Sequence, residues 1–206
     1  FSLLQVARPG EKLSNIGARV FGEHYKGHAF WDTEIYMLPF FTYTQPQTAK
    51  ALLMYRYYSL SGARRRAREE GFAGARFPWR SGMVRQVIHS VYAYGSVDAT
   101  YQGGEEQTTP KIWDFDMGPI PGENLFGRYE MHVNWAIAAA VKRYYEATGD
   151  REFLEDYGAE LMLEIARFAA SPKYAVWNSA RGTYDTRTIG PNEWGDREID
   201  DNSPGV

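Results

Sequence analysis

Residues 129–171 read YEMHVNWAIAAAVKRYYEATGDREFLEDYGAELMLEIARFAAS and contain two apolar stripes at helical spacing. The first stripe comprises Val133, Ile137, Val141 and Tyr144, and the second comprises Phe153, Leu154, Tyr157, Leu161, Ile165 and Phe168. Apolar residues that recur every three to four positions predict amphipathic helices. Gly149 is expected to cap the end of the first helix, and Asp150 to cap the start of the second. The one-residue junction predicts a helical hairpin.

The segments before this hairpin extend the helical pattern. HAFWDTEIYMLPFFTYT, residues 28–44, is apolar nearly all round, which favours a buried helix that Pro39 kinks or interrupts. Residues 45–71 predict a further helix that ends at Gly71, with the stripe Leu52, Leu53, Tyr57 and Leu60. Because strands and helices do not alternate, we expect a mostly helical chain in hairpin pairs, not a parallel sheet.

Two segments depart from the helical pattern. Residues 72–128 show no sustained period, and within them residues 83–95 are compatible with either a short helix or a strand. Structureless loops of that length are uncommon unless they are functional. After Pro172 the sequence predicts a β-hairpin, with Val176 and Trp177 before a glycine-containing turn and Tyr184 after it.

Composition narrows the class of protein. The 206 residues are 44% hydrophobic and 16% aromatic, which is enough for one packed core, and the net charge of -3 does not suggest a nucleic-acid partner. The absence of cysteine excludes disulfides and cysteine-based metal sites. No apolar window is long enough for a transmembrane helix, so we expect no membrane partner. A cysteine-free chain is compatible with a cytoplasmic enzyme, which is the localisation that we expect.

TIGPNEWGDREIDDN, residues 188–202, holds the outstanding candidate for a catalytic acid. The turn at Gly190 and Pro191 fixes the backbone before Glu193, and Trp194 beside it can exclude water. Such surroundings raise a carboxyl pKa, and a protonated carboxyl group is what cleavage of a glycosidic bond requires. On local chemistry alone an exposed loop glutamate is the commoner situation, because isolated carboxylates are abundant on surfaces.

GHAFWDTE, residues 27–34, holds a second group of candidates. Trp31 can stack on a sugar ring, and Asp32 can accept hydrogen bonds from two vicinal hydroxyl groups. The alternative is an aromatic core segment with one buried, hydrogen-bonded aspartate. His28 and Asp32 are four residues apart and could share a metal ion on a helix, but no third ligand is near in sequence, so no metal site is expected.

Three further candidates surround these segments. Trp79 follows a proline in FPWRSG, and Arg80 comes directly after it. Glu130 and His132 lie at the start of the predicted helix in RYEMHVN, where they either line a pocket or serve the helix alone. From spacing alone the second role is favoured for Glu130, since a carboxylate near a helix N-terminus complements the helix dipole.

Taken together, five segments in order resemble the central catalytic domain of glycoside hydrolase family 65. They are NIGARVFGEHYKGHAFWDTEIYMLPFF, LLMYRYYSLSGARRRAREEGFAGARFPW, GEEQTTPK, the helical hairpin at 129–171 and IGPNEW. Within this family the chain resembles maltose, trehalose and kojibiose phosphorylases, which have acid trehalases as hydrolytic relatives. The resemblance implies an all-α (α/α)6 barrel. Residues 1–206 are then about half of a single catalytic barrel domain, truncated at both ends, with long loops and a small β-hairpin.

The resemblance also implies roles for the candidates. Glu193 corresponds to the general acid, Trp31 and Asp32 line the glucose subsite, and Trp79 stands near the acceptor sugar. Glu130 and His132 are further substrate-binding candidates. The family usually has a glutamate where this chain has Arg80, so a different or relaxed acceptor is expected. Residues 83–102 look like additional sequence, and Asn192 and Trp194 replace the family's Asp and Tyr beside the acid.

The implied activity is inverting phosphorolysis of an α-glucosidic disaccharide to β-glucose 1-phosphate and an acceptor sugar. Inorganic phosphate is then the co-substrate, and no cofactor is expected. An inverting, trehalase-like hydrolase on the same barrel is the alternative, and a non-catalytic sugar-binding or scaffold protein is a third. We further expect the full-length parent to be a homodimer, and the isolated piece to be inactive.

Overall fold

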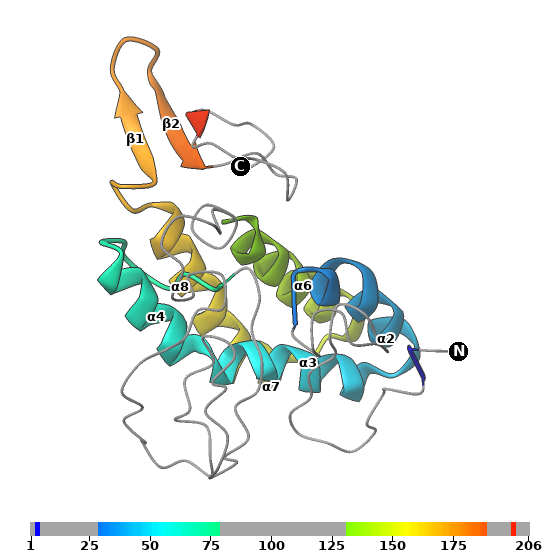
Figure 1. Ribbon diagram of the computed structural model, residues 1–206. Helices are drawn as coiled ribbons and strands as arrows, with labels where there is room; N and C mark the ends of the chain where they lie inside the picture. The colour runs from blue at the N-terminus through cyan, green and yellow to red at the C-terminus, as the bar shows by residue number, and fades with distance from the viewer. Residues whose placement is uncertain (1–2, 5–28, 79–130, 189–198, 201–206) are drawn as a thin grey trace, which may run out of the picture.

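The computed structural model describes residues 3–4, 29–78, 131–188 and 199–200, which are mostly helical with one small antiparallel sheet (Figure 1). The helical elements are η2 (Thr33–Met37), α2 (Leu38–Thr44), α3 (Pro46–Tyr58), α4 (Leu60–Glu69), α6 (His132–Thr148), α7 (Arg151–Phe153), η4 (Leu154–Gly158) and α8 (Ala159–Ala169), of which η2 and η4 are π-helical turns. The strands are β1 (Ala175–Asn178), β2 (Thr183–Thr188) and β3 (Ile199–Asp200). In these parts of the chain no helix has both the length and the apolarity to cross a membrane.

Helices α2 and α3 form a tight hairpin around a single residue, Gln45. Its backbone leaves the helical region (φ -146°, ψ 73°) because Pro46 follows, and a residue before proline is driven away from the α conformation. Pro46 is the first residue of α3, where its missing N–H costs nothing. Pro39 was expected to kink or interrupt a helix. Instead, a π-helical turn precedes α2, and Pro39 is the second residue of α2.

The predicted helix over 45–71 is two helices, α3 and α4, that meet at Ser59. The Ser59 hydroxyl donates to the Tyr55 carbonyl at 2.7 Å, and the Ser59 N–H is shared between the carbonyls of Tyr55 and Arg56 at 3.2 Å each. Serine that bonds back to the preceding turn bends helices, which a count of apolar spacings does not register. The predicted stop at Gly71 is confirmed, as its φ of 78° lies in the left-handed region.

The hairpin of α6 with α7, η4 and α8 forms at the position that the sequence predicts, with Gly149 and Asp150 between the helices. Gly149 adopts φ 66° and donates its N–H to the Tyr145 carbonyl at 2.8 Å. Asp150 caps the next helix, since its Oδ1 accepts the Phe153 N–H at 2.9 Å. Both cap predictions are confirmed.

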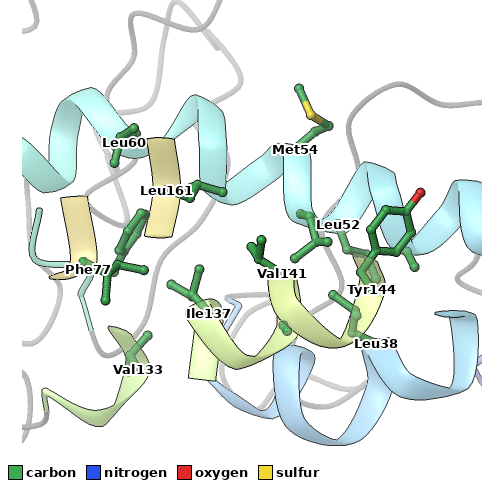
Figure 2. Close-up of a cluster of buried hydrophobic side chains, with 14 of the residues drawn as sticks. Leu38, Leu52, Met54, Leu60, Phe77, Val133, Ile137, Val141, Tyr144 and Leu161 are labelled. Carbon is green, nitrogen blue, oxygen red and sulfur yellow. The ribbon is translucent and has the colours of Figure 1, made fainter. Parts of the chain in front are cut away.

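The core is built around α6, which packs against α2, α3 and α8. Figure 2 shows its apolar side chains in the middle of the buried cluster, between α3–α4 on one side and α2 on the other. Val133, Ile137 and Val141 of the predicted stripe are fully buried. The helices on both sides of α6 therefore take their positions from it.

The predicted β-hairpin is confirmed and extends away from the helices beyond α8 (Figure 1). Strands β1 and β2 pair antiparallel with Trp177 opposite Tyr184, and their rings meet edge to face at 5.1 Å. Gly182 in the turn has φ 66°. Strand β3 then pairs antiparallel with the end of β2, which gives the strand order β1-β2-β3.

Candidate active site

Three segments that are far apart in sequence meet in the core: residues 30–34 contact residues 131–134 through Trp31 and His132, and residues 76–78 contact them through Phe77 and Asn134. Phe30, Phe77 and Val133, one from each segment, belong to the same buried cluster. Trp31, Asp32 and His132 are the predicted site residues that the structure describes. The other predicted site residues, Trp79, Arg80, Glu130 and Glu193, lie outside the described residues. We call the meeting point of the three segments the site junction.

Trp31 and His132 come together at the site junction although 101 positions separate them in sequence. Their rings meet edge to face, with 5.1 Å between centroids and 85° between planes. Trp31 also lies 5.5 Å from the ring of Tyr36, which is largely exposed. Trp31 and His132 are both half-buried. An indole and an imidazole in this arrangement can form a wall against which a sugar ring packs.

Asp32 is half-buried beside Trp31 and precedes the π-helical turn η2. Its backbone is already helical (φ -54°, ψ -36°), and its side chain makes no cap bond to the turn. The carboxylate is therefore not committed to helix capping. The Trp31 carbonyl accepts the N–H groups of both Glu34 and Ile35, each at 3.1 Å, so the turn holds this part of the backbone directly.

A buried ion pair between Glu34 and Arg56 joins the first segment of the site junction to α3. Arg56 Nε lies 2.6 Å from Glu34 Oε1, its Nη2 lies 2.9 Å from Oε2, and each side chain is 1% exposed. The same Nη2 donates to the Phe30 carbonyl at 3.2 Å. Burial lowers the pKa of Arg56, but the charge and hydrogen bonds of Glu34 outweigh it and raise that pKa above its ordinary value.

The pairing of Glu34 with Arg56 was not predicted from the sequence. The available signal was the position of Arg56 on the apolar stripe of its helix, four residues after Leu52 and four before Leu60. A charged residue on such a stripe either is buried with a partner or does not belong to the buried face, because burying a charge without a partner is very costly. Local spacing says nothing about which distant residue is the partner.

Asn134 joins the other two segments of the site junction. It is fully buried, its Oδ1 accepts the Phe77 N–H at 2.9 Å, and its Nδ2 donates to the Met131 carbonyl at 2.8 Å. One side chain thus fixes the backbone two residues before Trp79 and one residue before His132. Local sequence patterns do not predict that Asn134 bonds a segment 57 residues away.

The segment that leads to Trp79 is also tied to the helices. The Ala75 N–H donates to the Glu164 carbonyl of α8, and the Arg76 N–H to the Ala63 carbonyl of α4, each at 3.0 Å. Gly74 has φ 66°, and a Cβ built on it lies 2.2 Å from the Glu164 carbonyl oxygen. This backbone approaches α8 so closely that only glycine fits.

In the sequence, Glu193 falls between strands β2 and β3, and residues 189–198 are outside the described residues. Strand β2 ends at Thr188 and β3 begins at Ile199, and these two residues are ladder partners. Arg187 and Asp200 are the neighbouring backbone partners in the same ladder. The two ends of the segment that carries the predicted acid are therefore held side by side.

In the described parts of the chain no three His, Asp or Glu side chains gather as metal ligands, and His28 lies outside those parts. The site junction presents an aromatic wall, a carboxylate and an imidazole. These groups suit the binding of a neutral, hydroxyl-rich molecule.

Comparison with known proteins covers almost the whole chain. The profile of the glycosyl hydrolase family 65 central catalytic domain matches residues 1–203. The kojibiose phosphorylase of Halothermothrix orenii is 39% identical over 197 residues, covering 94% of this chain and 22% of the relative. The α,α-trehalose phosphorylase of Thermoanaerobacter brockii is 42% identical over 170 residues, covering 82% of this chain and 17% of the relative.

A solved structure shares the fold of the chain. It is a protein provisionally assigned as a kojibiose phosphorylase from the human microbiome, with a TM-score of 0.72 and 26% identity. The match covers 98% of this chain and 25% of that one. The chain thus spans a quarter or less of the length of these relatives.

Proposed function

The chain belongs to glycosyl hydrolase family 65, and on that premise we propose that it is part of an inverting disaccharide phosphorylase that acts on an α-glucoside. The observation that carries this proposal is the near-complete match of the chain to curated disaccharide phosphorylases at 39% to 42% identity. The meeting of Trp31, Asp32 and His132 at the site junction supports it. The activity is proposed for the full-length protein, and the 206-residue piece alone is proposed to be inactive.

The proposed reaction exchanges one bond at the anomeric carbon of glucose. Glu193 donates its proton to the glycosidic oxygen, the bond from that oxygen to C1 breaks, and the acceptor sugar leaves with the proton. A phosphate oxygen forms the new bond to C1 from the opposite face, which gives β-glucose 1-phosphate. Because phosphate is already an anion, no general base is required, and we propose no cofactor or metal ion.

The remaining residues divide between the two sugars. Trp31 packs on the glucosyl ring, Asp32 accepts hydrogen bonds from its hydroxyl groups, and His132 completes that wall. Trp79 and Arg80 are proposed to meet the acceptor, and the bond from the Phe77 N–H to Asn134 supports this because it fixes the backbone two residues before Trp79. Glu130, which precedes that start, is proposed to hydrogen-bond the substrate.

The architecture proposed for the full-length protein is an (α/α)6 barrel, to which this chain contributes about half. The two hairpins, α2–α3 and α6–α8, support it because such a barrel is made of helical pairs. The long loops between pairs then carry the site, as loops on a rigid scaffold commonly do. We also propose that the full-length protein is a cytoplasmic homodimer.

The proposal is tested by supplying the purified full-length protein with kojibiose, α,α-trehalose and glucosylglycerol, with and without inorganic phosphate. Phosphorolysis predicts that cleavage depends on phosphate and yields equal amounts of glucose 1-phosphate and acceptor. Cleavage at full rate without phosphate, with free glucose as the product, contradicts the proposal and favours the hydrolase alternative.

A further inference from the structure

The ion pair of Glu34 and Arg56 brackets Trp31 and Asp32. Arg56 bonds the Phe30 carbonyl, one residue before Trp31, and the Glu34 carboxylate, two residues after Asp32. We propose that Arg56 is a positioning residue that sets the direction of the Trp31 and Asp32 side chains for the glucosyl ring. This inference rests on the proposed function, which assigns those two side chains to that ring.

Stability alone is a poor explanation for this pair. Both side chains are 1% exposed, and removing two charges from water costs several kcal/mol per ion in proteins. Apolar residues of similar volume often give equal or greater stability at such positions. Apolar residues cannot replace the forked guanidinium of Arg56, which holds a backbone carbonyl and a carboxylate of residues 30–34 in a fixed relation.

The π-helical turn is the reason why this segment needs external support. A π turn contains one more residue than an α turn; such turns are rare and are frequently found at functional sites. If η2 relaxed to α-helical geometry, residues before it would rotate by roughly 100°, the angular step per residue of an α-helix. Trp31 would then leave its place against His132, 5.1 Å away. Arg56 opposes this change because it holds Phe30 and Glu34, on the two sides of the turn's start.

The test uses the full-length protein and a double-mutant cycle in glucose binding, measured by titration calorimetry. Arg56→Lys keeps the charge but loses the fork, so we expect glucose binding to weaken about tenfold, in line with the loss of charged hydrogen bonds. Asp32→Asn should also weaken binding. In the Asp32→Asn background, Arg56→Lys should add about threefold or less, because part of its effect is exerted through the carboxylate that asparagine has replaced.

Phosphorolysis gives a second readout. We expect Arg56→Lys to lower kcat/KM on the order of 100-fold, as displacement of reacting groups by an ångström does. Arg64→Lys is the matched control, because Arg64 also bonds two carboxylate groups of another element, Glu160 at 2.6 Å and Glu164 at 3.2 Å in α8, and neither lies at the site junction. It should leave glucose binding and kcat/KM unchanged. If Arg56→Lys cannot be purified folded, Glu34→Gln is expected to give the same cycle with Asp32→Asn.

The outcomes separate this inference from the function on which it rests. Additive effects of Arg56→Lys and Asp32→Asn overturn the positioning role, as does normal glucose binding in Arg56→Lys. In both cases a weakened Asp32→Asn variant leaves the proposed function standing. If Asp32→Asn binds glucose normally, the proposed site itself is wrong and the inference falls with it.

Discussion

The buried amide of Asn134 serves two segments at once, because its oxygen accepts from Phe77 and its nitrogen donates to Met131. Leucine has a similar size but neither polar group, so Asn134→Leu leaves the buried Phe77 N–H without this partner, whereas the Met131 carbonyl still accepts the backbone N–H of residue 134 at 3.1 Å. A buried N–H without a partner costs about 1 to 3 kcal/mol. We expect amide exchange in the peptide that contains Phe77 to accelerate more than tenfold in hydrogen-exchange mass spectrometry of the full-length protein.

Thr42→Val is the control for this prediction. Thr42 is also buried, but its hydroxyl donates to the Leu38 carbonyl within the same helix. This hydrogen bond joins no distant segments, so its loss should leave amide exchange at Phe77 unchanged. Unaltered exchange at Phe77 in Asn134→Leu would show that Asn134 does not hold this segment.

Glu193 is the residue on which the proposed chemistry depends. Glu193→Gln keeps the size of the side chain but has no proton to donate at neutral pH. General acids contribute about 100- to 10,000-fold to rate, so kcat should fall by that factor while glucose binding is nearly unchanged. Steady-state phosphorolysis and calorimetry measure the two quantities. Glu69→Gln, at an exposed helix position, is the control, and wild-type turnover in Glu193→Gln rules out the acid role.

At the scale of elements, Gly74 and Gly182 form a natural matched pair. Both have φ 66°, but a Cβ at Gly74 meets the Glu164 carbonyl oxygen of α8 at 2.2 Å, whereas a Cβ at Gly182 meets nothing within 4 Å. Gly182→Ala should therefore cost only the left-handed conformation, about 1 to 2 kcal/mol. Gly74→Ala adds a backbone clash and must displace the segment that leads to Trp79.

Thermal unfolding of the full-length protein distinguishes the two variants. The melting temperature should fall clearly more for Gly74→Ala than for Gly182→Ala, and acceptor KM should rise only in Gly74→Ala. Equal shifts for the two variants would mean that the close approach to α8 is not needed.

Asp150 links elements of both hairpins. Its carboxylate accepts the Phe153 N–H at 2.9 Å, the Lys50 ammonium of α3 at 3.0 Å and the Tyr144 hydroxyl of α6 at 2.9 Å. Burial alone would raise the pKa of Asp150, but these hydrogen bonds outweigh it and lower the pKa below its ordinary value. The charged form is thus favoured in the folded state.

A lowered pKa gives stability that is present above about pH 4, the ordinary value for aspartate, and is lost as the pH falls through the folded-state pKa. Asp150→Asn removes this contribution. We expect wild type to melt higher than Asp150→Asn at pH 6 and the difference to shrink as the pH approaches 3, measured by calorimetry. A constant difference across that range would contradict the role assigned to the charge.

The sequence predicted those elements whose causes are local. Gly149 and Asp150 end one helix and start the next through their own conformation and side chain, so both positions were correct. The break at Ser59 and the π turns were not predicted, because they depend on which backbone carbonyl a given N–H reaches. The Glu34–Arg56 and Asn134–Phe77 contacts were missed because they join segments 22 and 57 residues apart.

At the scale of the whole molecule, α6 relates the candidate site to the core. Its buried stripe fixes α2, α3 and α8, and its first residue, His132, contacts Trp31 at the site junction. The resemblance to family 65 predicted the family correctly, and Trp31 and His132, predicted from separate motifs, do meet. The catalytic and substrate-binding roles of all seven candidates remain predictions, and Trp79, Arg80, Glu130 and Glu193 lie outside the described residues.

The most direct test of the central claim is the identity of the first product. Proton and phosphorus NMR can follow the full-length protein in phosphate buffer with kojibiose or α,α-trehalose, and can identify the anomer of the glucose 1-phosphate that forms. An inverting phosphorylase predicts β-glucose 1-phosphate, in an amount equal to the released acceptor. Free glucose without a phosphate ester, or α-glucose 1-phosphate as the first product, would contradict it.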